Sequence, residues 1–175
     1  MTGVRYYVDH RKKSVWVPNL KVGSRTIERA IGEYVNGELF RRPREMMPEY
    51  LYYFWVMVTR HPLDRLRSYW DADMPAKEHE TFEDLVNDML DDGWRNPHTT
   101  PQSELIEGLK YPDLCLDISE LTPRWEEVSA CFSWPIPMEL RNVSPKHDPL
   151  PDYRRAELIE YYRKDFETFG YDPNA

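Results

Sequence analysis

The stretch YLYYFWVMVTRHPLDRLRSYW, residues 50–70, decides the fold of this chain. Residues 51–59 are almost wholly aromatic and β-branched, which is typical of a strand buried on both faces. Arg60 ends that run, and Pro62 then suits the first turn of a helix that carries Ser68. A helix that starts directly after a strand offers backbone N–H groups and the positive end of its dipole to an anion. We therefore predict that Arg60 and Ser68 hold one phosphate group from two sides.

A second strand–loop–helix pattern lies upstream. Residues 14–18 are predicted to form a short buried strand, and residues 27–35 have the apolar spacing of a helix. The single glycine of the loop lets the backbone approach a ligand, and the lysine adds a mobile charge. It is not a Walker A loop, in which the lysine follows a second glycine. The residues of this loop that we expect to bind an anion are Lys21, Val22, Gly23, Ser24, Arg25 and Thr26.

Taken together, the two patterns resemble the sulfotransferase family. Its members use a lysine-containing loop for the 5′-phosphosulfate of 3′-phosphoadenosine 5′-phosphosulfate (PAPS), and an Arg and a Ser eight positions apart for the 3′-phosphate. The resemblance implies that residues 21–26 hold the 5′-phosphosulfate and that Arg60 and Ser68 hold the 3′-phosphate. The product would be adenosine 3′,5′-bisphosphate. The chain departs from the family at Asn19-Leu20, where members usually place the lysine directly after a proline.

Two further segments resemble carbohydrate (Golgi-type) sulfotransferases and their bacterial and viral relatives. One is His98-Thr99-Thr100-Pro101-Gln102, which is similar to a histidine-to-Pro-Gln motif that follows the 3′-phosphate site. The other begins with RNVS at residues 141–144 and ends with DFETFGY at residues 165–171. By this resemblance, Arg141 and Lys146 are weaker candidates for holding the nucleotide from its other side.

Sulfuryl transfer moves an SO₃ group in line from a phosphate oxygen to an acceptor oxygen, so positioning and charge stabilisation carry the catalysis. Lys21 is the natural group to stabilise charge on the leaving 5′-phosphate, and no metal ion is expected. The acceptor hydroxyl needs a general base, for which a histidine has a suitable pKa. His98 is the candidate, with Glu28, Glu33 and Glu104 as rival bases.

The other four histidines are less suitable as the base. His10 and His79 lie in strongly charged stretches and are expected to be solvated. His61 directly follows Arg60 and is expected to pack beside the cofactor. His147 lies in a loop that is expected to fold over the nucleotide.

Composition predicts one compact domain over residues 1–175, because 41% of the residues are hydrophobic and 14% are aromatic. No apolar run reaches the length of a membrane span, and no signal-like segment opens the chain. Cys115 and Cys131 lack metal-site spacing and are expected to be buried free thiols. These features favour a cytoplasmic enzyme.

Charge divides unevenly along the chain. Residues 1–70 carry a net charge of +6, and residues 71–175 carry −14. The basic part holds both phosphate patterns, whereas the acidic part disfavours long polyanions such as nucleic acids. The expected partner is therefore a small-molecule or glycan acceptor, with no nucleic acid and no membrane.

Strands that alternate with helices predict an α/β protein with a three-layer, mostly parallel central sheet flanked by helices. The resemblance to the sulfotransferase family implies that this is a P-loop-like sulfotransferase fold. Residues 5–8 are expected to form an edge strand or a hairpin partner. Further along we expect a helix over 81–90 capped by Thr81, a buried strand over 114–118, a helix capped by Ser119 or Thr122, and a last helix capped by Asp152.

The sequence is best interpreted as a PAPS-dependent sulfotransferase that acts on a hydroxyl of a carbohydrate or another small acceptor. Two alternatives remain open. One is a small ATP-dependent kinase, which the missing Walker A loop disfavours. The other is a degenerate nucleotide-binding domain that has lost catalysis, which the altered loop at Asn19-Leu20 allows.

Overall fold

The computed structural model describes residues 6–22, 27, 38–40, 48–72, 78–133 and 150–175. Contacts divide the chain into two compact units. The first unit comprises Met1–Thr59 and Leu105–Val143, and the second comprises Arg60–Glu104 and Ser144–Ala175. The single domain expected over residues 1–175 stays a prediction, and each unit is described by itself below.

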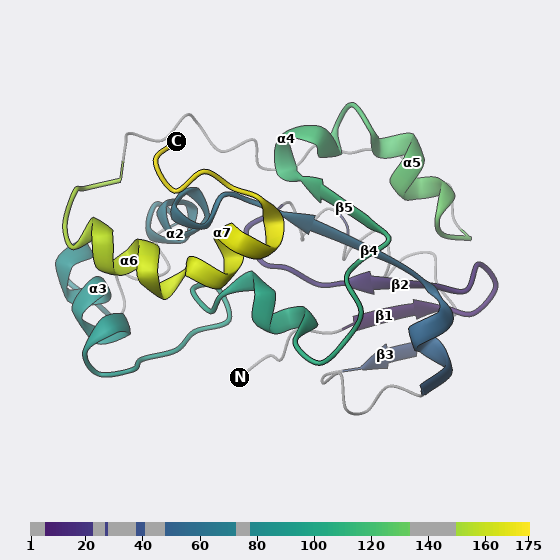
Figure 1. Cartoon of the computed structure of the whole chain (residues 1–175), viewed down its shortest axis with the longest axis horizontal. Helices are drawn as coiled ribbons and strands as arrows, with labels where there is room; N and C mark the ends of the chain where they lie inside the picture. The colour runs from purple at the N-terminus through teal and green to yellow at the C-terminus, as the bar shows by residue number, and fades with distance from the viewer. Residues whose placement is uncertain (1–5, 23–26, 28–37, 41–47, 73–77, 134–149) are drawn as a thin grey trace. The chain divides into compact units, whose positions relative to one another are not determined.

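The first unit is built on a five-stranded mixed sheet in the order β3-β1-β2-β4-β5 (Figure 1). β1 pairs antiparallel with both β2 and β3, whereas the β2–β4 and β4–β5 pairs are parallel. The α/β class is therefore confirmed, but the sheet is mixed rather than mostly parallel. The strands are β1 (Tyr6–Asp9), β2 (Ser14–Val17), β3 (Glu38–Phe40), β4 (Phe54–Thr59) and β5 (Leu114–Asp117).

The antiparallel β1–β2 pair arises because only residues 10–13 connect the two strands, and so short a turn joins antiparallel neighbours. Lys13 completes the turn with a left-handed φ of 51°. The hairpin predicted for residues 5–8 is confirmed, but β1 is not an edge strand, because β3 pairs with its other side. The aromatic run at 51–59 also divides. Its first residues belong to the short 3-10 helix η2 (Pro48–Tyr52), and Tyr52 is 90% exposed.

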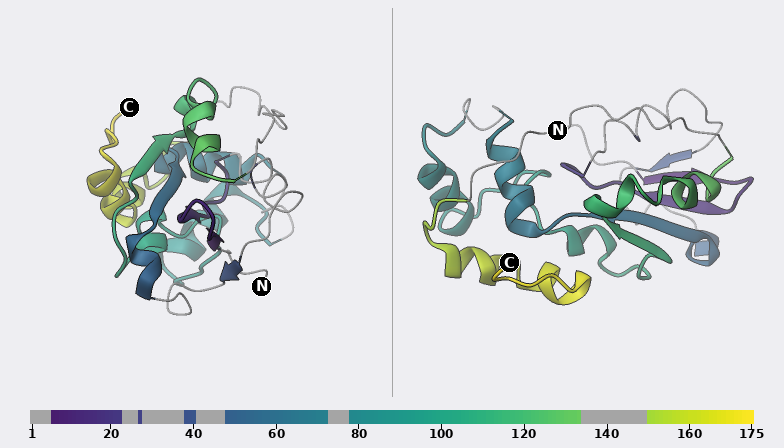
Figure 2. Two further views of the ribbon diagram at one scale, coloured as in Figure 1. Left: turned by 90° about the vertical axis from the view of Figure 1, so that its right-hand side faces the viewer. Right: turned by 90° about the horizontal axis from the view of Figure 1, so that it is seen from above.

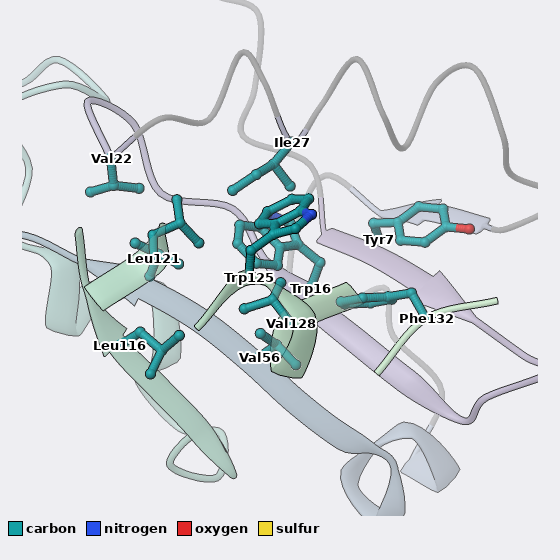
Figure 3. Packing of buried hydrophobic residues seen from close by; sticks show 11 residues of the cluster. Tyr7, Trp16, Val22, Ile27, Val56, Leu116, Leu121, Trp125, Val128 and Phe132 are labelled. Carbon is teal, nitrogen blue, oxygen red and sulfur yellow. The ribbon is translucent and has the colours of Figure 1, made fainter. Parts of the chain in front are cut away.

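β4 is the buried strand that the sequence predicts, since residues 55–59 are all buried. The helices α4 (Ile118–Leu121) and α5 (Trp125–Ala130) cover one face of the sheet (Figures 1 and 2). Figure 3 shows their side chains packed onto the strands. The buried cluster on this face comprises Tyr7, Trp16, Val22, Ile27, Val56, Val58, Leu116, Leu121, Trp125, Val128 and Phe132.

The predicted cap at Ser119 or Thr122 is wrong. The helix that carries Trp125 is α5, whose N-cap position is Arg124 with no side-chain capping hydrogen bond. Asp117 caps the preceding α4, because its carboxylate accepts the Ser119 N–H at 2.8 Å. The Glu120 carboxylate in turn accepts the Asp117 N–H at 3.0 Å, which completes a capping box. The preceding strand β5 lies at the edge of the sheet, and only Leu116 of its four residues is fully buried.

The second unit is helical and has its own core. Its helices are α2 (Pro62–Trp70), α3 (Phe82–Leu90), α6 (Arg155–Tyr161) and α7 (Arg163–Phe169). The predicted Thr81 cap of α3 is confirmed, since Thr81 Oγ1 accepts the Asp84 N–H at 3.1 Å in a capping box. The core comprises Leu63, Leu66, Tyr69, Phe82, Leu85, Val86, Met89, Leu158, Tyr162 and Phe166.

The last helix does not begin at Asp152 as predicted. α6 follows Arg154, which has a left-handed φ of 49°, and the helical run breaks at Tyr162 before α7 (Figures 1 and 2). Tertiary contacts outweigh the local cap signal. Arg154 binds both Asp91 and Glu157 through its guanidinium, and the Tyr162 hydroxyl donates to the Thr99 carbonyl at 2.7 Å.

Candidate functional site

Arg60 is the first residue after β4, and its main chain is held by one side chain. The Arg60 N–H donates to Gln102 Oε1 at 3.1 Å, and Gln102 Nε2 donates to the Arg60 carbonyl at 2.8 Å. The Gln102 amide thus supplies the two hydrogen bonds that a neighbouring strand would make. Since Gln102 is fully buried, this pairing fixes the backbone from which the half-buried Arg60 side chain projects.

The N-terminus of α2 has no side-chain cap. His61 occupies the N-cap position without a capping hydrogen bond, and Pro62 fills the first helical position. The first backbone N–H groups of a helix have no partner within it, so such an end attracts anions. Asp64 is the only acidic residue in the first turn, and it is exposed. Ser68 lies two turns into the same helix and is 7% exposed.

His98 lies in a tight loop of the second unit. The Asn96 side chain accepts the His98 N–H at 2.9 Å, while the Asn96 carbonyl accepts the N–H groups of Thr99 and Thr100. The His98 ring stacks on Tyr69, with centroids 5.2 Å apart and planes 14° apart. Burial raises the pKa of Tyr69, and the charge of Glu78 adds to that effect. The stacking therefore fixes the ring plane of His98, the candidate base, and the residue remains half-exposed.

Two buried polar side chains hold the His98 loop by its carbonyl groups. Arg65, which is 1% exposed, donates to the carbonyls of Thr100 at 2.9 Å and Pro97 at 3.2 Å. Tyr162 donates to the Thr99 carbonyl. Desolvation lowers the pKa of Arg65, and the electrostatic influence of Tyr162 and Asp165 acts in the opposite direction.

Sequence reasoning did not assign these supporting roles. Gln102 belongs to the predicted histidine-to-Pro-Gln segment, and the sequence pattern assigns no role to Arg65. A usable signal was present in the helical pattern. Arg65 lies one position from the core residue Leu66 and four from Tyr69, so a charged group there points to a buried partner.

Lys21 belongs to the first unit, in the turn after β2. It is half-buried and has a left-handed φ of 69°. The preceding Asn19 is fully buried, and its Nδ2 donates to the Val58 carbonyl near the end of β4 at 3.0 Å. Asn19 therefore fastens the start of the loop to β4, the neighbouring parallel strand.

The remaining loop residues differ in what they can offer. The Val22 side chain is fully buried in the core of the first unit, so only its main chain remains for ligand binding. The predicted helix over 27–35 is described only at Ile27, which is also buried in that core. Several predicted site residues lie outside the described residues: Gly23, Ser24, Arg25, Thr26, Arg141 and Lys146.

The expectation that His79 is solvated is wrong. His79 is 5% exposed, its Nε2 lies 3.0 Å from Asp88 Oδ2, and its ring meets Trp94 edge-on. His10 is exposed, as expected. His61 packs edge-on against Phe166, and its Nε2 is hydrogen-bonded to the Asp172 carbonyl. His147 lies outside the described residues.

Of the rival bases, only Glu104 is described. Both of its carboxylate oxygens accept from Arg95 Nη1, at 2.7 and 2.9 Å, so this carboxylate is already paired. Glu28 and Glu33 lie outside the described residues. Tyr69 is buried, with its ring stacked against that of His98.

The described parts of the chain contain no group of three or more His, Cys, Asp or Glu side chains arranged for a metal ion. Likewise, none of the helices described here combines the length and the apolar character needed to cross a membrane. Cys115 and Cys131 are free thiols, as expected, but both are half-buried rather than fully buried. Burial raises the pKa of each thiol.

Comparison with known proteins gave no match: no protein-family model, no curated protein and no solved structure is similar to this chain.

Proposed function

We propose that this protein is a PAPS-dependent sulfotransferase that transfers a sulfuryl group to a hydroxyl of a carbohydrate or another small acceptor. The observation that carries the proposal is the environment of Arg60. Its main chain is fixed by Gln102 immediately after a buried parallel strand, and an uncapped helix with a buried serine follows it. The proposal includes the three-layer, P-loop-like sulfotransferase fold, with β2, β4 and β5 as the parallel strands of its sheet.

The second unit has suitable groups for a 3′-phosphate. A phosphate needs several directed donors, and charge-assisted donors bind it best. Arg60 supplies a guanidinium on a fixed backbone, Ser68 supplies a hydroxyl, and the start of α2 supplies N–H groups. This set suits a terminal phosphate monoester such as the 3′-phosphate that distinguishes PAPS from ATP.

The first unit contributes Lys21 in the turn after the parallel strand β2. Ligands of open α/β sheets bind beyond the carboxyl ends of parallel strands, which is where this turn lies. The anchoring of Asn19 to the Val58 carbonyl gives the loop a fixed start. In the proposed reaction Lys21 stabilises negative charge on the leaving 5′-phosphate, and Ser24, Arg25 and Thr26 add donors to the same group.

His98 is the proposed general base for the acceptor hydroxyl. Its main chain is held by Asn96, its ring is stacked on Tyr69, and the carbonyls of its loop are bound by Arg65 and Tyr162. A ring with so many constraints retains little rotational freedom, which lowers the entropic cost of proton abstraction. Glu104 is the less suitable base, since Arg95 already binds its carboxylate.

Nucleotide selectivity tests the proposal. Titration calorimetry should show much tighter binding of adenosine 3′,5′-bisphosphate than of AMP or ATP. Arg60→Ala should weaken binding of the bisphosphate at least tenfold, since a charged hydrogen bond contributes about 1.5–3 kcal/mol. The substitution leaves the main-chain bonds to Gln102 in place, so the loss reports on the guanidinium.

Arg67→Ala is the matched control, because Arg67 lies on the same helix but pairs with Asp71 at 2.8 Å. It should leave nucleotide affinity unchanged. Equal affinities for ATP and the bisphosphate would contradict the proposal and favour the kinase alternative. Binding of the bisphosphate without transfer to any of a broad panel of hydroxyl acceptors would favour the non-catalytic alternative.

A further inference from the structure

Asp165 of α7 binds Gln102, the residue whose side chain holds the Arg60 main chain, and the neighbouring Ser103. It is fully buried, and its two oxygens accept separate backbone N–H groups. Oδ2 accepts from Gln102 at 2.8 Å, and Oδ1 accepts from Ser103 at 2.7 Å. These are the first N–H groups of the 3-10 helix η4 (Gln102–Ile106), so Asp165 caps this short helix from 62 to 63 residues away in the chain.

The same carboxylate also fixes the Gln102 side chain. Gln102 Nε2 makes a long hydrogen bond of 3.5 Å to Asp165 Oδ2 while it donates to the Arg60 carbonyl at 2.8 Å. The amide therefore has its nitrogen oriented by two acceptors and its oxygen oriented by the Arg60 N–H. With both its main chain and its side chain bound, Gln102 has one orientation in which every bond is made.

Opposite charges hold the two ends of the loop between residues 97 and 103. Arg65 binds carbonyl groups at Pro97 and Thr100, and Asp165 binds N–H groups at Gln102 and Ser103. Both side chains are buried, and the charge of Asp165 favours the charged form of Arg65 by raising its pKa. Isolated buried charges are costly, so the hydrogen bonds that each side chain makes to the loop offset the cost of its burial.

We infer that Gln102 and Asp165 are positioning residues for the phosphate-binding Arg60. Neither residue is assigned to the nucleotide itself. Asp165 orients Gln102, Gln102 orients the Arg60 main chain, and that main chain directs the guanidinium. The inference rests on the proposed function for its ligand, but the chain of contacts from α7 to Arg60 is a property of the second unit alone.

A double-mutant cycle on nucleotide affinity tests the link from Gln102 to Arg60. Gln102→Met keeps the length and volume of the side chain but removes both hydrogen bonds to Arg60. It should weaken binding of adenosine 3′,5′-bisphosphate about tenfold in the wild-type background. In the Arg60→Ala background the same change should have little further effect, since the guanidinium that Gln102 positions is gone. Equal losses in both backgrounds would overturn the inference.

Asp165→Asn tests the first link. The amide retains one acceptor oxygen for one N–H group, but its NH₂ group faces the second N–H group and cannot accept from it. Affinity for the bisphosphate should fall severalfold at a temperature where the variant remains folded by circular dichroism. Glu167→Gln is the matched control on the same helix, because Glu167 is exposed and pairs only with Arg163 among the described ion pairs.

Hydrogen exchange separates this inference from the proposed function. In the nucleotide-free protein, both Gln102→Met and Asp165→Asn should speed exchange of the Arg60 amide, while amides in the middle of α3 remain protected. Wild-type protein that fails to bind the bisphosphate would refute the proposed function but leave this exchange test valid. An Arg60 amide equally protected in wild type and both variants would refute the positioning role.

Discussion

The imidazole ring of His98 lies almost parallel to the phenol ring of Tyr69, with centroids 5.2 Å apart. Tyr69 follows Ser68 in α2, so the proposed base rests on the residue next to a proposed phosphate ligand. A shift of α2 would therefore affect both. The stacking also keeps Tyr69 buried, which makes the orientation of the base part of the core of the second unit.

His98→Ala should reduce turnover by about 10²–10⁴-fold, the usual contribution of a general base. Affinity for adenosine 3′,5′-bisphosphate should change little, because His98 is not assigned to either phosphate. Steady-state kinetics with labelled PAPS and calorimetry measure the two effects separately. His10→Ala is the control, since His10 is exposed and its ring contacts are with Tyr50 and Tyr53 of the first unit. Near-normal turnover in His98→Ala would direct attention to Glu28, Glu33 and Glu104.

Lys21→Gln should lower both turnover and affinity for PAPS, since the ammonium group is proposed to contact the 5′-phosphate of PAPS in the ground state and in the transition state. Glutamine removes the charge but keeps a long, unbranched side chain at this position, which has a left-handed φ. Lys13→Gln is a closely matched control, because Lys13 also has a positive φ and is exposed. Equal kinetic losses in the two variants would argue against a specific role for Lys21.

Transfer from PAPS should persist in an excess of EDTA. In the proposed reaction Lys21 and the hydrogen-bond donors of its loop stabilise the negative charge on the leaving phosphate. In kinases Mg²⁺ stabilises the corresponding charge. The measurement is the initial rate with labelled PAPS before and after chelation. A magnesium-dependent kinase in the same buffer is the control for complete chelation. Loss of activity that magnesium restores would contradict the mechanism.

Asp9→Asn should lower the free energy of unfolding by about 1–3 kcal/mol at neutral pH, the cost of unsatisfied buried hydrogen bonds. Asp9 is 3% exposed and joins the β1–β2 turn to Ser133. Its carboxylate accepts the N–H groups of Arg11, Lys12 and Ser133 and the Ser133 hydroxyl. Urea unfolding of the two proteins measures the difference, with the exposed Glu126→Gln as control.

The effect of Asp9 should depend on pH in a defined direction. Burial alone would raise the pKa of Asp9, but the hydrogen bonds from Lys12, Ser133 and Arg11 outweigh it and lower the pKa. The stabilisation is therefore fully present above the unfolded-state pKa of about 3.9 and is lost as the pH falls through the lower folded-state value. The difference between wild type and Asp9→Asn should be constant from pH 5 to pH 7 and shrink below about pH 4. A difference that grows with acidity would contradict this account.

Much of the local structure was predictable because short patterns determine it. The apolar run that became β4, the helix over 82–90 and its Thr81 cap all follow from residues close together in sequence. The errors occurred where distant contacts compete with local signals. Asp152 has the chemistry of a cap, yet the helix starts after Arg154, whose guanidinium binds Asp91, 63 residues away in the chain.

The candidate site divides in the same way. The sequence by itself determined that Arg60 ends a buried strand and that Ser68 follows on a helix, since hydrophobic periodicity and Pro62 specify both elements. Only the tertiary structure decided that Gln102 holds the Arg60 main chain and that Asp165 holds Gln102. These pairs lie 42 and 63 residues apart. Such hydrogen bonds depend on where two backbones meet after the core has packed, and no local pattern of residues specifies that meeting.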